Sequence, residues 1–186
     1  MTKDRQYYSA TIGADTVVRL VRRPRSADPL DGFLVGASSD LAMLHVLDDH
    51  AMTLNGYAVV RCRDIRWWRP DTSFVSRALR ILGQTPVAPE GVELKDWPSL
   101  LRWAAARYPL LGIEDEFRAP GCLRIGTIRK LGKRALRLNT VGPDAAPGRK
   151  LRYPYSDITC VTFGDGYSSA LARLVAHEAA SQGSEP

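Results

Sequence analysis

Apolar and polar residues alternate in a series of short segments that occurs twice along the chain, about 93 residues apart. Alternation with a period of two is typical of β-strands that bury one face. The first series predicts five strands: Val17–Leu20, Gly32–Gly36, Leu41–Leu47, Tyr57–Cys62 and Asp64–Trp68. The second predicts Leu110–Ile113, Gly126–Ile128, Ala135–Val141, Leu151–Tyr155 and Asp157–Phe163. A repeated set of five short strands indicates two similar β domains.

Three other segments show the helical period of about 3.6 residues. Two of them, Phe74–Leu82 and Trp97–Tyr108, separate the two series of strands, and Tyr167–Ala180 follows the second series. Candidate N-caps precede the first two helices, namely Asp71–Ser73 and Asp96, because their side-chain oxygens accept hydrogen bonds from free helical N–H groups. The chain is therefore predicted to be mainly β with accessory helices.

These patterns divide the chain into an N-terminal β domain (residues 1–70), a helical connection (71–109) and a C-terminal β domain with its terminal helix (110–186). Domains of roughly 60–70 residues are marginally stable on their own. We therefore expect them to be stabilised by contacts with each other, by the helices or by self-association.

Charge adds one candidate property. The chain carries 26 Lys and Arg against 20 Asp and Glu, a formal net charge of +6, and arginine predominates. Arginine binds phosphate groups through two parallel hydrogen bonds, so this bias is compatible with nucleic-acid binding, although a genome rich in G and C produces the same bias. The surplus is about +2 in residues 1–70, about +1 in 71–109 and about +3 in 110–186, which indicates no dedicated basic tail.

Cysteine usage and hydropathy exclude several classes of protein. Cys62, Cys122 and Cys160 are odd in number and widely spaced, which argues against a disulfide framework and a zinc site. No apolar run approaches the roughly 20 residues that a membrane helix requires, and the first residues lead into no signal-peptide core. We expect a cytoplasmic protein that does not bind membranes.

Two short motifs resemble those of the Sm-like superfamily. The first is Gly32-Phe33-Leu34, five residues, then Asp40-Leu41-Ala42-Met43, and the second is Val60-Arg61-Cys62 followed by Ile65. The resemblance implies two tandem Sm-like five-stranded small barrels joined by two helices, plus a C-terminal helix, as in a bacterial family of duplicated Sm-like proteins. It also implies RNA binding, although Cys62 stands where that family has a glycine beside its base pocket, and the second series lacks the Arg-Gly pair.

Two basic clusters are the candidate nucleic-acid sites. The first consists of Arg61, Arg63, Arg66 and Trp67, with Arg69 and Trp68 beside them, and alternation would place Arg61 and Arg63 on one side of a strand. The second surrounds a turn at Gly132 and consists of Arg129, Lys130, Lys133 and Arg134, flanked by Arg124 and Arg137. Exposed aromatic rings stack on bases, and basic turns hold phosphates. The alternative for each cluster is an ordinary solvated strand edge or turn.

Other polar clusters point less clearly to chemistry. His45 and His50 lie near Asp48 and Asp49, where a polar hairpin turn is favoured over a metal site. Glu114-Asp115-Glu116 is interpreted as solvated charge on an edge segment. The sequence contains no nucleophile motif, phosphate loop or dinucleotide fingerprint. We therefore predict no enzymatic activity, no metal, no cofactor and no small-molecule substrate.

Two functions fit these observations. The first is a non-enzymatic structural or protein-interaction module that assembles through its barrel edges or its helices, with self-association as one form of assembly. The second is an RNA-binding protein of Sm-like type that uses its arginine-rich faces. One continuous basic face across both domains would favour RNA, and scattered charge would favour the structural module.

Overall fold

The computed structural model describes residues 16–71 and 73–182. The ten strands are β1 (Val18–Arg22), β2 (Leu30–Ala37), β3 (Leu41–Asp48), β4 (Thr53–Arg61), β5 (Ile65–Pro70), β6 (Leu111–Glu114), β7 (Leu123–Leu131), β8 (Ala135–Val141), β9 (Pro147–Pro154) and β10 (Cys160–Phe163). The helices are the short 3₁₀ helix η1 (Cys62–Asp64), α2 (Val75–Ile81), α3 (Trp97–Ala105) and α4 (Gly166–Gln182). The predicted mainly β fold with accessory helices is confirmed.

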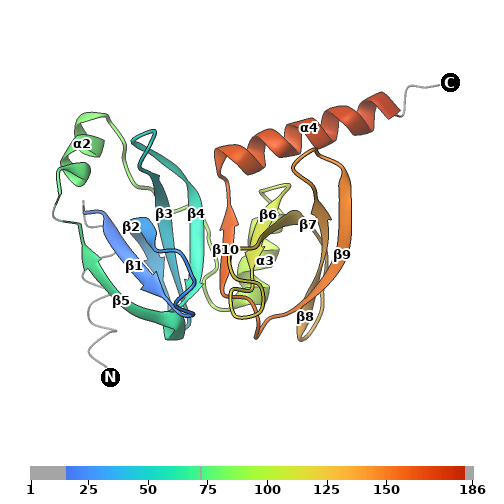
Figure 1. Cartoon of the computed structure of the whole chain (residues 1–186), viewed down its shortest axis with the longest axis horizontal. Helices are drawn as coiled ribbons and strands as arrows, with labels where there is room; N and C mark the ends of the chain where they lie inside the picture. The colour runs from blue at the N-terminus through green and yellow to red at the C-terminus, as the bar shows by residue number, and fades with distance from the viewer. Residues whose placement is uncertain (1–15, 72, 183–186) are drawn as a thin grey trace.

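All ten strands belong to one antiparallel sheet with the order β5-β1-β2-β3-β4-β10-β6-β7-β8-β9. The first five strands in chain order form one half of the sheet and the last five form the other, as Figure 1 shows. The two halves meet where β4 pairs with β10. Strands β5 and β9 are the two edges of the sheet.

The two halves have the same internal strand order, with the fifth strand paired to the first and the fourth strand at the other end of the half. Their irregularities also correspond, because register shifts fall between Leu34 and Gly36 in one half and between Ile128 and Lys130 in the other. The expectation of closed barrels is wrong, however. The fourth and fifth strands of a half do not pair with each other, because β4 pairs with β10 of the other half instead.

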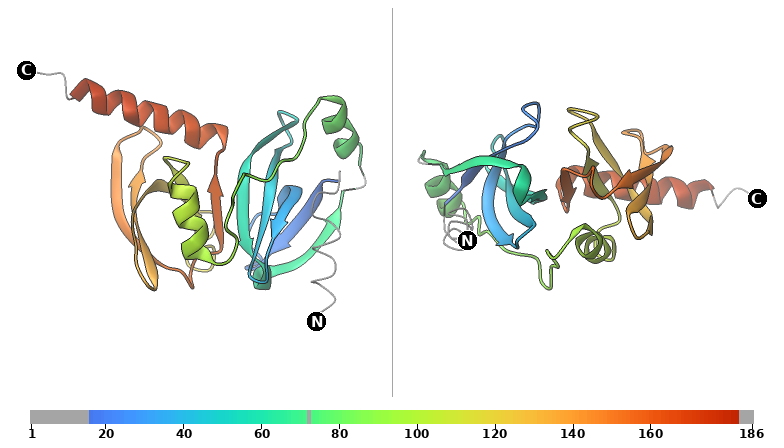
Figure 2. Two further views of the ribbon diagram at one scale, coloured as in Figure 1. Left: turned by 180° about the vertical axis from the view of Figure 1, so that it is seen from behind. Right: turned by 90° about the horizontal axis from the view of Figure 1, so that it is seen from below.

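Helix α3 covers the joint between the halves. Met43, Val59, Val161 and Ile113 are successive register partners across β3, β4, β10 and β6, and all four are buried. They share a hydrophobic core with five residues of α3: Trp97, Leu100, Leu101, Trp103 and Ala104. Figure 2 shows α3 lying against the strands of the C-terminal half. One continuous core therefore fixes the second half to the first.

The three predicted helices are present, α2 and α3 shorter than predicted and α4 longer. Asp96 caps α3 as expected, since its Oδ1 accepts a hydrogen bond of 2.8 Å from the Ser99 N–H. Among the candidate caps of α2, Thr72 lies outside the described residues, as do the predicted N-terminal segment through residue 15 and the last four residues. No helix in the described part of the chain combines the length and apolar character needed to span a membrane.

Two equivalent glycines allow the close strand packing of each half. A Cβ at Gly32 would overlap the carbonyl oxygen of His45, and a Cβ at Gly126 would overlap that of Asn139. Overpacking of this kind destabilises folded proteins by roughly 1–3 kcal/mol. We expect Gly126→Ala to lower the unfolding free energy by about 2 kcal/mol in urea denaturation.

The matched control for this prediction is Gly166→Ala at the start of α4. A Cβ there would meet only the Asn55 Oδ1 atom, at an ordinary contact distance of 3.6 Å. This substitution should change stability by less than about 0.5 kcal/mol. Equal effects of the two substitutions would contradict the assignment of a packing role to Gly126.

Candidate nucleic-acid interface

Three basic side chains stand opposite one another across β7, β8 and β9. Lys130 is the register partner of Arg137, and Arg137 is the register partner of Arg152. Directly opposed residues of neighbouring strands project from the same face of a sheet, so the three form one row, which we call the basic row. All three are exposed. None lies within 4.0 Å of a carboxylate oxygen of any residue that the structure describes.

The basic row is electrostatically unfavourable for the sheet by itself. Like charges on directly opposed strand positions destabilise the pairing. Two unit charges about 6 Å apart in water repel each other by about 0.7 kcal/mol. An anion bound over the row would replace this repulsion by attraction, so the arrangement favours a polyanionic ligand.

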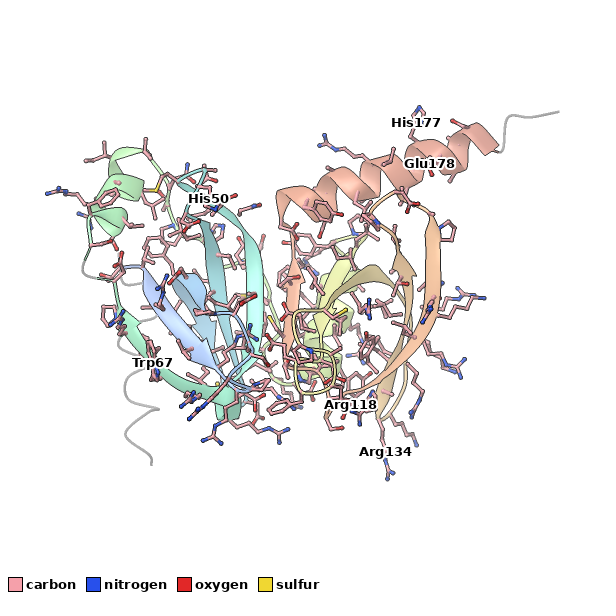
Figure 3. The ribbon with its side chains drawn as sticks, in the orientation of Figure 1. His50, Trp67, Arg118, Arg134, His177 and Glu178 are labelled. Atoms are coloured by element: carbon pink, nitrogen blue, oxygen red, sulfur yellow. The ribbon has the colours of Figure 1, made fainter. Side chains whose placement is uncertain are left out.

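The turn between β7 and β8 extends the row. Lys133 and Arg134 form the exposed part of this turn, and Figure 3 shows Arg134 projecting from its tip. The turn is held by Tyr155, whose hydroxyl donates to the Gly132 carbonyl at 3.0 Å and whose N–H donates to the Arg134 carbonyl at 3.1 Å. Both turn residues and the basic row line one surface recess of 190 Å³.

Lys150 completes this cluster, because it lies two residues before Arg152 on β9 and therefore on the same face. We call the six residues Lys130, Lys133, Arg134, Arg137, Lys150 and Arg152 the basic surface. The segment 119–156 contains nine Lys and Arg but only one acidic residue, Asp144. The net charge of about +3 over residues 110–186 conceals this concentration, because the acidic residues of that half lie mainly outside 119–156.

The equivalent positions of the N-terminal half are apolar and covered. Gly36, Met43 and Val59 are successive register partners, just as the basic row is, at the corresponding places of β2, β3 and β4. Met43 and Val59 are buried in the core that includes α3. The equivalent face of each half thus serves the internal joint in the N-terminal half and carries exposed positive charge in the C-terminal half.

The first predicted cluster does not form such a surface. Arg61 is buried, its Nε donates to Asp64 Oδ2 at 2.6 Å, and its Nη1 donates to the Ser156 carbonyl at 2.6 Å. The expectation that Arg61 and Arg63 lie on one side of a strand is also wrong, because β4 ends at Arg61 and Arg63 lies in η1. Arg61 therefore ties the two halves together rather than facing solvent.

The other members of the first cluster are exposed but occupy a different environment. Trp67 is 44 % exposed, and the guanidinium of Arg69 lies 5.6 Å from the centre of its ring. Arg66 is exposed on the edge strand β5, and Arg63 lines a recess together with two carboxylates, those of Asp40 and Asp96. Such mixed charge is less suited to phosphate than the basic surface.

The two predicted clusters are not continuous with each other. Strand β5 is one edge of the sheet, and β7, β8 and β9 lie at the opposite end. Figure 3 shows Trp67 and Arg134 on different halves. Trp68, rather than Trp67, packs against the core of the N-terminal half.

The sequence identified part of the basic surface and missed the rest. Arg129, Lys130, Lys133 and Arg134 were predicted from their proximity to one turn, and all four are exposed. Arg129 lies at the register shift of β7 and is not part of the basic surface. Lys150 and Arg152 were missed because they are distant in sequence. Their spacing of two residues in a strand could have identified them, because it places Lys150 and Arg152 on one face.

The remaining polar candidates separate into exposed and buried groups. His50 is exposed, whereas His45 is half-buried, stacks on Tyr57 and accepts a hydrogen bond from the Val87 N–H through Nδ1. Among the described residues, no group of three or more His, Cys, Asp or Glu side chains is placed to hold a metal ion. The interpretation of Glu114–Glu116 as solvated edge charge is wrong, because β6 is an interior strand and Glu116 is buried.

The comparisons with known proteins found no match among family models, curated proteins or solved structures.

Proposed function

We propose that this protein binds single-stranded RNA through the phosphate groups, on the basic surface of its C-terminal half. The observation that carries the proposal is the basic row, in which three cations without carboxylate partners among the described residues are directly opposed across three strands. The other three cations of the basic surface extend the positive field along the turn and along β9. We further propose that the two halves are tandem Sm-like units, a proposal supported by their matching strand order and register shifts.

Phosphate contacts set the expected character of binding. Lys and Arg contacts to the backbone carry no sequence information, so binding should depend weakly on base sequence. Arg137 and Arg152 suit phosphate especially well, since a guanidinium donates two parallel hydrogen bonds. No aromatic side chain belongs to the basic surface as defined, so base stacking is not part of the proposal.

A salt titration tests the proposal. Fluorescence anisotropy of a labelled oligouridylate of about 12 nucleotides is measured between about 0.05 and 0.2 M salt. Each phosphate neutralised on a single strand contributes about −0.7 to the slope of log K against log salt. Six contacts predict a slope of about −4. Absence of binding at the lowest salt concentration, or a slope near zero, would contradict the proposal.

Self-association is the second candidate, and the two open edges of the sheet favour it. Unpaired strand edges present free N–H and C=O groups to another chain. Both edges nevertheless carry features that oppose pairing. Strand β5 ends at Pro70 and carries Arg66 and Arg69, and β9 contains Pro147 and Pro154 together with its own basic residues.

Light scattering at increasing protein concentration tests self-association: a stable oligomer supports this candidate, and a monomer at every concentration contradicts it.

A further inference from the structure

A group of three charged residues lies between the two halves, apart from the basic surface: Arg22 and Glu116 are buried, and the side chain of Glu114 is 19 % exposed. Arg22 at the end of β1 donates two hydrogen bonds to Glu116, from Nη1 to Oε2 at 2.7 Å and from Nη2 to Oε1 at 3.1 Å. Glu114 Oε2 lies 3.8 Å from the Arg22 Nη2. The side chains of Arg22 and Glu116 are only 2 % and 4 % exposed. We call these three residues the Arg22 cluster.

The charges of the Arg22 cluster do not balance when all three groups are ionised. Two carboxylates then face one guanidinium, which leaves a net charge of −1 in a buried site. Arg22 is the cation that lowers the pKa of Glu114, whereas Asp28 of the β1–β2 loop adds further negative charge, and Cys160 of β10 is the buried register partner of Glu114. A buried unpaired charge is strongly disfavoured, and a carboxyl group in such a site takes up a proton instead.

Hydrogen bonds hold the backbone of the two glutamates in position. The Glu116 N–H donates to the Thr159 hydroxyl at 3.2 Å, and that hydroxyl donates to the Glu114 carbonyl at 3.1 Å. The Thr159 N–H also donates to the Glu114 carbonyl, at 2.9 Å. Thr159 therefore fixes the backbone from which both side chains extend toward Arg22.

We propose that Glu114 and Glu116 share one proton next to Arg22, and that the joint between the two halves weakens as the pH rises toward neutrality and this proton is released to solvent. Protonated, the cluster carries no net charge, and the Arg22 guanidinium keeps its contacts with both carboxyl groups. Deprotonated, it carries the buried net charge described above. The joint is therefore a pH-sensitive element of the fold, independent of any RNA ligand.

The expected sign of the pH dependence follows from proton binding. Burial, the hydrogen bond with Glu116 and repulsion by its charge raise the pKa of Glu114 to about 7 from an ordinary value of 4.5. The folded state then binds more protons than the unfolded state between these two values. Stability from this group is complete below the ordinary pKa and is lost as the pH rises toward and through 7.

Denaturant unfolding of the wild type and of Glu114→Gln tests the proposal between about pH 5 and pH 8. The amide keeps the size of the side chain and its hydrogen bonding but cannot ionise. The wild-type unfolding constant, divided by that of the variant, should rise by a factor approaching ten for each pH unit between about 5 and 7. A ratio that does not change with pH would overturn the proposal.

Two controls distinguish the titration of Glu114 from that of other groups. Burial lowers the pKa of His45, which contributes with the opposite sign in an overlapping range, but His45 is common to both proteins and cancels in the ratio. Glu93→Gln removes an exposed carboxylate and should leave the dependence of stability on pH unchanged.

Carbon-13 NMR of the Glu114 carboxyl carbon in the wild type provides a test that needs no variant: a titration midpoint near neutral pH supports the proposal, and a midpoint near the ordinary glutamate value overturns it.

Discussion

Replacing Arg22 by methionine is expected to lower the unfolding free energy by about 3–5 kcal/mol, because it leaves two carboxyl groups in a buried site without their cation. Methionine retains most of the aliphatic volume of the side chain, so loss of packing contributes little. Arg22 also donates to the Asp28 carbonyl at 3.3 Å, and this bond to the neighbouring loop is lost as well. The loss should be greatest at about pH 8, where neither carboxyl group can be neutralised readily by a proton.

Arg19→Met is the matched control for this prediction. Arg19 lies in the same strand and donates two hydrogen bonds to Asp31, at 2.8 and 2.6 Å, so its pairing geometry is similar. Its side chain is 47 % exposed, however, and that of Asp31 is 26 % exposed. Exposed ion pairs contribute about 0–1 kcal/mol. Urea denaturation of both variants tests the prediction. Similar small losses of unfolding free energy would show that burial does not strengthen the contribution of the Arg22–Glu116 pair.

Removal of the basic row is expected to abolish most of the RNA affinity. In the variant Lys130→Ala/Arg137→Ala/Arg152→Ala, three phosphate contacts are lost, and each accounts for about 0.7 of the salt slope. The slope should therefore fall by about 2. The same relation predicts a loss of affinity of roughly 30-fold at 0.2 M salt and several hundredfold at 0.05 M salt. Anisotropy titrations at both salt concentrations measure these losses.

The control for the basic row is Arg63→Ala/Arg66→Ala/Arg69→Ala in the N-terminal half. This control removes the same number of positive charges, three, from the formal net charge of +6. If the basic surface binds the phosphates, this variant should keep nearly the wild-type slope. Equal losses in the two variants would show that binding follows net charge and not the basic surface. Both variants should unfold at nearly the wild-type denaturant concentration, because all six side chains are exposed.

The strand pattern was largely predictable, because a period of two along the chain records which side of each strand is buried. The polar turn Ser38–Asp40 between β2 and β3 and the Asp96 cap of α3 are also local features, and both are present. The repeat was visible for the same reason. Equivalent strands of the two halves bury equivalent faces, and Gly32 and Gly126 mark the same close contact in each.

The candidate site was only partly predictable. Residues on one turn, such as Lys133 and Arg134, were found because neighbours in sequence remain neighbours in space. Arg152 joins them through pairing of β8 with β9, which alternation alone does not specify. Arg61 shows the converse case, since a basic residue beside other arginines in sequence is buried against Asp64 and Ser156.

The sequence by itself determined the number of strands, the shared pattern of the two halves, the helices and the surplus of positive charge. Only the tertiary structure decided that β4 pairs with β10, that the sheet stays open, and that Glu114–Glu116 lies inside rather than at an edge. The physical reason is the range of the interactions. Strand periodicity and helix capping act within a few residues, whereas strand neighbours and the burial of charge depend on contacts between residues far apart in the chain.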